Sequence, residues 1–261
     1  MILYFSATGN SRHIAQLLSE RLNDKRLIDL RTYYGSQTDS FLLSKGENIC
    51  FVFPVHSWGM PKNLDRLIGQ LRFDNYEKNN NYCTLVLTCG DDAGQTARQW
   101  QKAVAQCGLE GDAAFSVFMP NTYVLLPGFD IDSPELTSKK LNAAPTLVDD
   151  IARRIQNREK GDFTFHGSFS WAKSKIIYPL FMRFMTSDKP FVSKEDKCIE
   201  CGKCVKVCPT GNIQLEKTSS GKLLPKWHGD CLNCLACFHH CPTRSIEYGK
   251  STIKKGTYHY R

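Results

Sequence analysis

Eight of the twelve cysteines lie in the last quarter of the chain, in two runs of identical spacing. In each run two residues separate the first three cysteines, three more precede the fourth, and a proline follows at once. The runs are Cys198, Cys201, Cys204 and Cys208, and Cys231, Cys234, Cys237 and Cys241. Thiolates at this spacing are the ligands of four-iron clusters. The sequence therefore predicts two 4Fe-4S clusters, whose chemistry is the transfer of single electrons.

The spacing also predicts which cysteines share a cluster. A tight loop can place three thiolates, each separated from the next by two residues, around one cluster. The fourth thiolate lies too far along the chain to bind the same cluster. We therefore expect each fourth cysteine to bind the cluster of the other run. One cluster would take Cys198, Cys201, Cys204 and Cys241, and the other Cys231, Cys234, Cys237 and Cys208.

Zinc sites and disulfides are the alternative uses of so many cysteines. Structural zinc takes paired C-x₂-C knuckles and has no use for a third evenly spaced cysteine. Disulfides need an oxidising compartment, and Met1 leads directly into a predicted strand without an export signal. We therefore expect a cytoplasmic location. The remaining cysteines lie in apolar strand or helix contexts and are expected to be small buried hydrophobic residues: Cys50, Cys83, Cys89 and Cys107.

Positive charge is concentrated in the same region. The chain has a formal net charge of +8, and residues 189–261 hold 13 Lys and Arg against 6 Asp and Glu, a net +7. Each oxidised cluster with four thiolates adds about −2, so these basic residues largely offset the clusters and do not indicate a nucleic-acid partner. The remaining charge would steer an acidic redox partner protein toward the clusters. No apolar run approaches the roughly 20 residues of a membrane span.

Strand and helix signals alternate along the N-terminal part. Five short apolar segments predict strands, and the third is apolar without interruption, as in a strand covered on both faces. This alternation predicts an α/β fold, a doubly wound five-stranded parallel sheet with helices on both faces. The expected strands are 2–5, 26–30, 49–53, 82–88 and 114–119, and the expected helices are 10–22, 61–71, 95–107 and 133–157.

The turn after the first strand is a candidate phosphate-binding site. It reads Ser6-Ala7-Thr8-Gly9-Asn10-Ser11 and leads directly into a helix, where backbone N–H groups and the helix dipole favour an anion. Gly9 gives the turn its backbone freedom. The turn is neither a Walker loop nor a G-x-G-x-x-G motif. The alternative is that Asn10 or Ser11 is a plain N-cap of the helix. An N-cap accounts for only one polar residue, whereas four of the six residues in this turn are polar.

This turn resembles the FMN-phosphate loop of flavodoxins. Two further segments are similar to the flavin loops of that family, residues 54–61 after the third strand and 88–94 after the fourth. The resemblance implies bound FMN at the carboxyl edge of the sheet. It implies Ser6, Thr8, Asn10 and Ser11 at the phosphate, Pro54, His56, Trp58 and Gly59 in the second loop with Trp58 beside the isoalloxazine ring, and Cys89, Gly90, Asp91 and Gly94 in the third.

The third loop lacks the aromatic residue that many flavodoxins place against the outer face of the flavin. Trp58 or His56 would stack on one face, and the other would be covered by Tyr123, by the cluster domain, or left open to a substrate. A core position for Trp58 and a structural role for His56 are the alternatives. Asp91 and Asp92 would lower the flavin potential if they lie near its pyrimidine edge, or they form a solvent-facing turn.

Together with the cysteine runs, the chain resembles flavodoxin–ferredoxin fusion proteins of anaerobic prokaryotes. The resemblance implies a flavodoxin-like domain over residues 1–157 and a small α+β two-cluster ferredoxin domain over 189–261. In the connector, residues 158–188, the apolar stretch 176–185 would pack between the domains, or alternatively lie on a membrane surface. The predicted function is electron transfer between a redox partner, the clusters and FMN. The alternative is an FMN-dependent reductase of a small-molecule acceptor, and the oligomeric state is left open.

Overall fold

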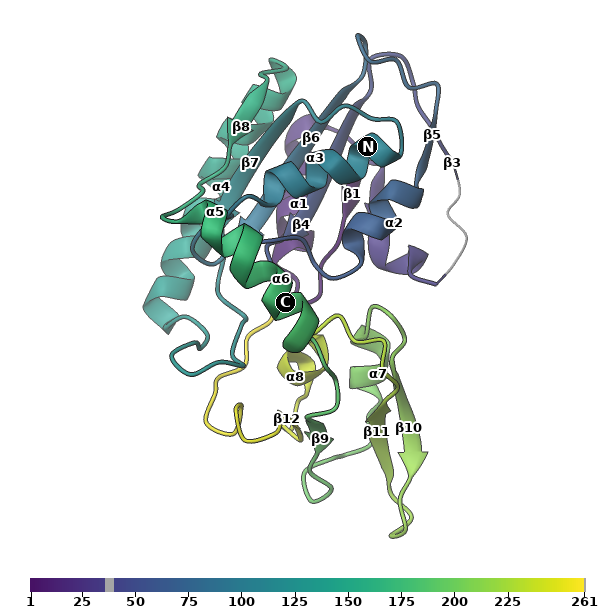
Figure 1. Cartoon of the computed structure of the whole chain (residues 1–261), viewed down its shortest axis with the longest axis vertical. Helices are drawn as coiled ribbons and strands as arrows, with labels where there is room; N and C mark the ends of the chain where they lie inside the picture. Colours follow the sequence, from purple (N-terminus) through teal and green to yellow (C-terminus); the bar gives the residue numbers. More distant parts are fainter. Residues whose placement is uncertain (36–39, 261) are drawn as a thin grey trace.

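The computed structural model describes residues 1–35 and 40–260. Its N-terminal domain is built on a six-stranded parallel sheet, and the smaller C-terminal domain lies below it in Figure 1. The strand order is β2-β1-β4-β6-β7-β8, so the chain first builds outward to one side of β1 and then to the other. The strands are β1 (Ile2–Tyr4), β2 (Leu27–Asp29), β4 (Asn48–Pro54), β6 (Tyr82–Cys89), β7 (Ala113–Phe118) and β8 (Gly161–Phe163).

Helices cover both faces of this sheet. On one face, α1 (Asn10–Leu22) and α4 (Pro134–Gln156) bury residues such as Leu18 and Val148 against the strands. On the other face, α2 (Leu64–Gln70) and α3 (Thr96–Gln106) form a second core around Trp100. The predicted doubly wound α/β fold is confirmed, and each predicted strand and helix is found.

Three short strands were not predicted. β8 extends the sheet at its edge, pairing with β7 from Ala113–Gly161 to Phe115–Phe163, and it comes from the segment that we placed in the connector. All three of its residues are exposed, so it has no apolar pattern to reveal it. The other two, β3 (Ser40–Leu42) and β5 (Arg72–Asp74), form a separate parallel pair beside the main sheet.

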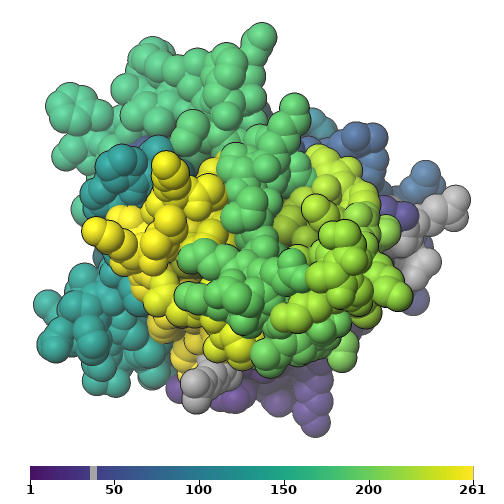
Figure 2. Space-filling model, turned by 90° about the horizontal axis from the view of Figure 1, so that it is seen from below, coloured from purple at the N-terminus to yellow at the C-terminus, as the bar shows by residue number. Residues whose placement is uncertain are grey.

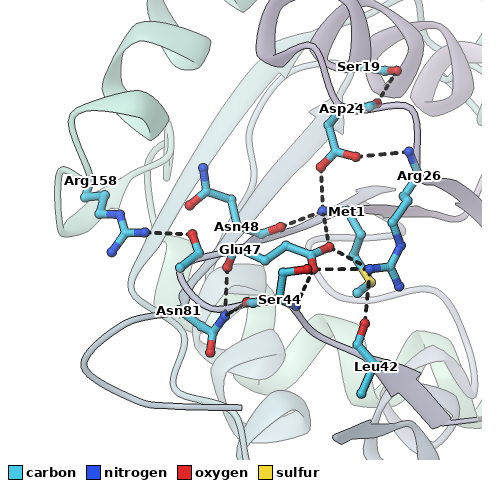
Figure 3. A network of polar contacts seen from close by, with 11 residues as sticks. Met1, Ser19, Asp24, Arg26, Leu42, Ser44, Glu47, Asn48, Asn81 and Arg158 are labelled. Atoms are coloured by element: carbon cyan, nitrogen blue, oxygen red, sulfur yellow. Dashed lines mark hydrogen bonds and ion pairs between the residues drawn. The ribbon is translucent and has the colours of Figure 1, made fainter. Parts of the chain in front are cut away.

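A polar network closes the amino edge of the sheet, away from the predicted site (Figure 3). The amino group of Met1 donates to the carbonyl oxygen of Asn48 (2.6 Å) and to Oε1 of Glu47 (3.2 Å), and it pairs with Asp24 Oδ2 at 2.5 Å. Glu47 also accepts a hydrogen bond from Arg26 Nη1 at 2.9 Å. These contacts join the starts of β1, β2 and β4, so the opposite, carboxyl edge is the one left for a ligand.

The C-terminal domain contains two antiparallel strand pairs and two short helices. β9 (Phe191–Ser193) pairs with β12 (Ile246–Tyr248), and β10 (Ile213–Lys217) pairs with β11 (Leu223–Trp227). The helices α7 (Lys203–Val207) and α8 (Ala236–His240) each lie within one cysteine run. In the core of the domain the rings of Phe191 and Trp227 stack, with their centroids 5.2 Å apart.

Two segments connect the domains. A continuous helical segment, α5 (Ser170–Ala172), the π-helix η2 (Lys173–Ile177) and α6 (Tyr178–Phe184), crosses the front of the N-terminal domain toward the C-terminal one (Figure 1). Residues 249–260 then return to the N-terminal domain, where the backbone N–H of Gly256 donates to Asp130 Oδ1 at 3.0 Å. Figure 2 shows this yellow segment against the teal part of the chain. No helix within the described residues is long and apolar enough to cross a membrane.

Candidate functional site

The two cysteine runs enclose two separate cavities. The structure brings together the two groups of thiols that were predicted to share a cluster. One cavity is lined by Cys198, Cys201, Cys204 and Cys241, and the other by Cys208, Cys231, Cys234 and Cys237.

The local backbone explains how short loops surround these cavities. Each run contains two residues with positive φ at equivalent places, Glu200 and Gly202 in the first and Asn233 and Leu235 in the second. A buried leucine rarely adopts this conformation, so its presence at Leu235 indicates that the loop geometry is imposed by the surroundings. The turn lets the backbone N–H of Asn233 donate to Cys231 Sγ at 3.3 Å, the kind of contact that tunes cluster potentials.

The thiols fit clusters better than single ions. Among the described residues, no group of three or more His, Cys, Asp or Glu side chains converges closely enough to hold one metal ion, as a zinc site would require. Burial raises the pKa of the Cys234 thiol to about 12, so iron would have to displace its proton. Four thiols line each cavity, which is the number of ligands that a 4Fe-4S cluster takes.

A third cavity lies at the carboxyl edge of the sheet, over the predicted phosphate turn. It is lined by Ser6, Thr8, Asn10 and Ser11, by Pro54 and His56 of the second loop, and by Cys89 and Gly90 of the third. We call this cavity the crevice. The four polar residues of the turn are buried, and the Oγ of Ser11 lies 2.7 Å from Thr88 Oγ1 at the end of β6.

The first turn of α1 is available to an anion. Its N-cap is Gly9, at φ 98°, and no side chain caps the helix there, so the alternative of a plain N-cap at Asn10 or Ser11 is wrong. Uncapped N–H groups at a helix N-terminus are a favourable place for a phosphate. The side chain of Asn10 is oriented by a hydrogen bond, in which its Nδ2 donates to the carbonyl oxygen of Pro120 at 2.9 Å.

Three buried polar atoms of crevice residues have no hydrogen-bond partner within the described part of the chain. They are Oδ1 and Nδ2 of Asn233 and the hydroxyl of Tyr123, and both residues line the crevice. Buried polar atoms in native proteins are nearly always hydrogen-bonded. The crevice therefore fits a ligand that carries polar groups along its length as well as an anion at one end.

A larger cavity of about 460 Å³ continues from the crevice, within the range of small-molecule sites. The two share Val55, Ser57, Cys89, Gly90, Asn121, Tyr123 and Phe181. Trp58, Asp91 and Asp92 line only the larger one on its loop side, and its opposite wall is apolar, formed by Leu126, Phe129, Ile177, Leu180, Phe181, Phe184 and Met185.

The aspartates of the third loop differ in their surroundings: Asp91 is exposed, as expected of a solvent-facing turn, whereas Asp92 is not. Asp92 forms an ion pair with Lys173 Nζ at 2.6 Å, and its side chain is only 9% exposed. It is therefore neither a free negative charge nor part of a solvent-facing turn. The ammonium group of Lys173 also lies 5.2 Å from the ring centroid of Trp58, which places a cation beside the predicted flavin loop.

Three of the predicted site residues lie outside the lining of both cavities: Gly9, Gly59 and Gly94. Each instead permits a close approach by a segment from further along the chain. A Cβ at Gly59 would clash with the ring of Tyr178, and one at Gly94 would lie 2.6 Å from Ser174 Oγ. Gly59 and Gly94 thus let the helical connector pack on the loops, and Gly9 lets Tyr260 approach the phosphate turn.

Residues 258–260, which sequence reasoning did not assign, support the phosphate turn. The hydroxyl of Tyr258 donates to Asn10 Oδ1 at 3.1 Å, and the backbone N–H of Tyr260 donates to the carbonyl oxygen of Thr8 at 2.8 Å. The ring of Tyr260 stacks on His13 with 4.1 Å between centroids. Nothing in the sequence signals these contacts beyond the aromatic character of the segment.

The buried ring of His239 joins three parts of the molecule. Its Nδ1 accepts a hydrogen bond from the backbone N–H of Tyr258 at 3.2 Å, so Nε2 carries the proton and donates to the carbonyl oxygen of Thr122 at 2.7 Å. Burial lowers the pKa of this imidazole to about 4. His239 thus fixes α8 and the last segment to the loop after β7.

The crevice and the second cluster cavity share a wall. Cys234 and Leu235 line both of them, and Leu232 of the same run is buried in the core of the N-terminal domain. Lys62, from the loop before α2, donates through Nζ to the carbonyl oxygen of Cys231 at 3.0 Å. The loop that carries the second cysteine run is therefore part of the crevice.

The fold and these cavities define an α/β domain with a ligand crevice, joined to a small domain with two thiol-lined cavities. Comparison with protein families agrees: a model described as "Flavodoxin domain" matches residues 1–125, and one described as "4Fe-4S dicluster domain" matches residues 197–245. The chain thus consists of an N-terminal flavodoxin domain and a C-terminal 4Fe-4S dicluster domain. These domains imply a flavin, two 4Fe-4S clusters and electron transfer. Comparison with curated proteins gives no match.

Proposed function

We propose that the chain relays electrons between a redox partner protein, its two 4Fe-4S clusters and an FMN in the crevice. The observation that carries this proposal is the shared wall, because Cys234 and Leu235 line both the crevice and the second cluster cavity. A 4Fe-4S cluster exchanges single electrons, whereas FMN exchanges one or two. A single chain that holds both would link one-electron donors to two-electron chemistry.

The residues of the crevice would divide the work of binding. The polar residues of the turn and the N–H groups of α1 would hold the phosphate. Asn233 Oδ1 and the hydroxyl of Tyr123 would meet polar groups of the ligand, since both are buried without a partner in the described structure. Trp58 would lie beside the ring, with Lys173 on its other side.

The test is anaerobic reconstitution followed by rapid mixing with a one-electron donor protein. We expect about eight irons and one FMN per chain, and reduction of the flavin only when the second cluster is present. Cys234→Ala should slow flavin reduction at least tenfold, whereas Cys107→Ser, a half-buried cysteine outside the runs, should leave it unchanged. Flavin reduction at the same rate in both variants would contradict the relay.

The partner itself is proposed to be an acidic protein that docks at the cluster domain. Residues 189–261 carry a net +7 before the clusters are counted. Attraction between opposite charges is screened by salt, so the second-order rate of reduction by an acidic donor should fall as ionic strength rises. A rate that does not depend on salt would argue against this partner.

A second candidate is a reductase that passes electrons from FMN to a small molecule. The observation that favours it is the cavity of about 460 Å³, whose wall opposite the flavin loops is apolar. Its test is anaerobic reoxidation of the reduced chain by a panel of apolar and polar acceptors. A reoxidation rate that saturates with an apolar acceptor would support a reductase. A rate that rises linearly with the concentration of every acceptor would instead support the electron carrier.

A further inference from the structure

The helical connector exposes an apolar stripe to solvent. Trp171, Ile176, Leu180 and Phe184 are exposed by 60%, 50%, 52% and 65%. Their spacing of five, four and four residues follows the helix: the five-residue step crosses η2, where hydrogen bonds run from i to i+5, and the four-residue steps lie in α6. The π-helical turn therefore keeps all four on one face. Phe169, which is 84% exposed, adjoins it at the N-terminal end.

Specific contacts fix the opposite face of the same segment to the flavodoxin domain. The Oγ of Ser174 donates to the carbonyl oxygen of Trp58 at 2.7 Å and accepts from the backbone N–H of Gln95 at 2.8 Å. The hydroxyl of Tyr178 donates to the carbonyl oxygen of Met60 at 2.9 Å. Turning the stripe inward would break these bonds, so its exposure is a property of the folded domain.

The charged residues of the segment itself are all positive. Residues 165–187 contain Lys173, Lys175 and Arg183 and no Asp or Glu. Lys173 is paired with Asp92, but Lys175 and Arg183 are exposed. Several large apolar side chains exposed on one face of a helix indicate an interaction surface. Aromatic residues flanked by Lys and Arg are typical of helices that lie in a membrane interface.

We propose that this surface, residues 169–184, docks on an anionic lipid bilayer. Trp171 and Phe184 would enter the headgroup region, and Lys175 and Arg183 would meet lipid phosphates. A second copy of the chain is the less favourable occupant, because a two-fold contact between two such segments brings the exposed cations of both copies together and the segment has no acidic residue of its own to pair with them. Contact with the bilayer needs no change in the domain.

Docking would also place the larger cavity at the bilayer surface, since Leu180 and Phe184 belong both to the stripe and to the cavity wall. This consequence rests on the proposed function, but the docking itself does not, because it depends only on the connector. Lipid binding and flavin content can therefore be measured separately.

The test is co-sedimentation of the reconstituted full chain with vesicles of phosphatidylglycerol and of phosphatidylcholine. We expect binding to the anionic vesicles that weakens in high salt, and at least tenfold weaker binding for Trp171→Ser with Phe184→Ser. Lys175→Glu with Arg183→Glu should weaken it similarly. Leu42→Ser, at a leucine 64% exposed on the other side of the domain, is the matched control and should bind as wild type does.

A second measurement covers the case in which the double variant fails to fold. Phosphatidylglycerol with brominated acyl chains should quench tryptophan fluorescence of the wild type more than that of Trp171→Phe, which keeps an aromatic ring in place. Absence of wild-type binding, equal binding to both kinds of vesicle, or lipid-independent dimerisation that Phe184→Ser abolishes would each overturn the proposal.

Discussion

The hydroxyl of Tyr258 donates a hydrogen bond to Oδ1 of Asn10 over 3.1 Å, although 248 positions separate the two residues. Asn10 lies in the first turn of α1 and lines the crevice, whereas residues 249–260 contribute nothing to its lining. The last segment of the chain therefore supports the phosphate turn from outside. Burial raises the pKa of Tyr258 to about 12, so the hydroxyl remains a donor at all physiological pH values.

Removal of this one hydroxyl should weaken flavin binding. Tyr258→Phe leaves the ring in place but removes the donor that orients Asn10, a loss of about 1 kcal/mol. We expect a roughly fivefold higher Kd for FMN, measured by quenching of flavin fluorescence on titration with the flavin-free chain. Tyr82→Phe removes a hydroxyl that donates to the carbonyl oxygen of Glu159, at the start of β6 and the opposite edge of the sheet, and should leave the Kd unchanged. Equal effects of both substitutions would show that Tyr258 acts only on overall stability.

Crossed ligation predicts that the fourth cysteine of each run affects the cluster of the other run. Cys208 lines the cavity of the second run and Cys241 that of the first. Cys208→Ser should therefore alter the spectrum and potential of the cluster beside the crevice, and Cys241→Ser those of the distant cluster. The measurement is electron paramagnetic resonance during stepwise reduction, compared with Cys231→Ser and Cys198→Ser. If Cys208→Ser matched Cys198→Ser instead of Cys231→Ser, each run would hold its own cluster.

Lys173, paired with Asp92, should make the midpoint potential of the flavin less negative than it would be beside an unpaired carboxylate. Lys173→Met removes the cation and leaves the nearby carboxylate uncompensated, which disfavours adding negative charge to the flavin. We expect the midpoint potential of the flavin to become more negative by roughly 40 mV for one electron, which corresponds to a free-energy change of about 1 kcal/mol. Asp92→Asn should shift it in the opposite direction.

The double variant Lys173→Met with Asp92→Asn provides the control for this pair. Its potential should return close to that of the wild type, because both charges are gone. Lys175→Met, at an exposed lysine two residues further along the same segment, should have little effect. An unchanged potential in all four proteins, measured by anaerobic spectroelectrochemistry, would place the pair too far from the flavin to matter.

The sequence predicts the sheet well because its strands are buried on both faces, as in 49–53, where the apolar run is unbroken. It misses β8, whose three residues are exposed and are held by pairing with β7. The thiol groups could be predicted from spacing, since the two runs have identical spacing and the fourth cysteine of each lies too far from its own loop to share that loop's cluster. The contacts of Tyr258 and His239 could not, because they depend on how two domains meet and no local pattern encodes that arrangement.

The exposed stripe of the connector shows the same limit. Residues 176–185 were expected to pack between the domains, and one face does pack on the flavodoxin domain through Ser174, Tyr178 and Phe181. The other face remains exposed, because the π-helical turn changes the helical period inside the segment. A regular 3.6-residue pattern would have assigned Trp171 and Ile176 to different faces.

The last prediction concerns His56, which lines the crevice. Burial lowers the pKa of its imidazole from 6.5 to about 4. Above pH 6.5 the ring is neutral in both the folded and the unfolded chain, so it does not alter the pH dependence of stability there. As the pH falls from 6.5 to 4, the unfolded chain binds a proton that the folded chain excludes, and the free energy of unfolding decreases.

Between pH 7 and pH 5 this effect should cost the wild type about 1–2 kcal/mol. His56→Gln cannot be protonated and should lose that much less over the same interval, measured by urea unfolding followed by tryptophan fluorescence under anaerobic conditions. His228→Gln, at a half-exposed ring that pairs with Glu216, is the matched control. If His56→Gln and the wild type lost stability in parallel as the pH fell, the imidazole of His56 would be accessible to protons in the folded chain, and the crevice would be wetter than its burial indicates.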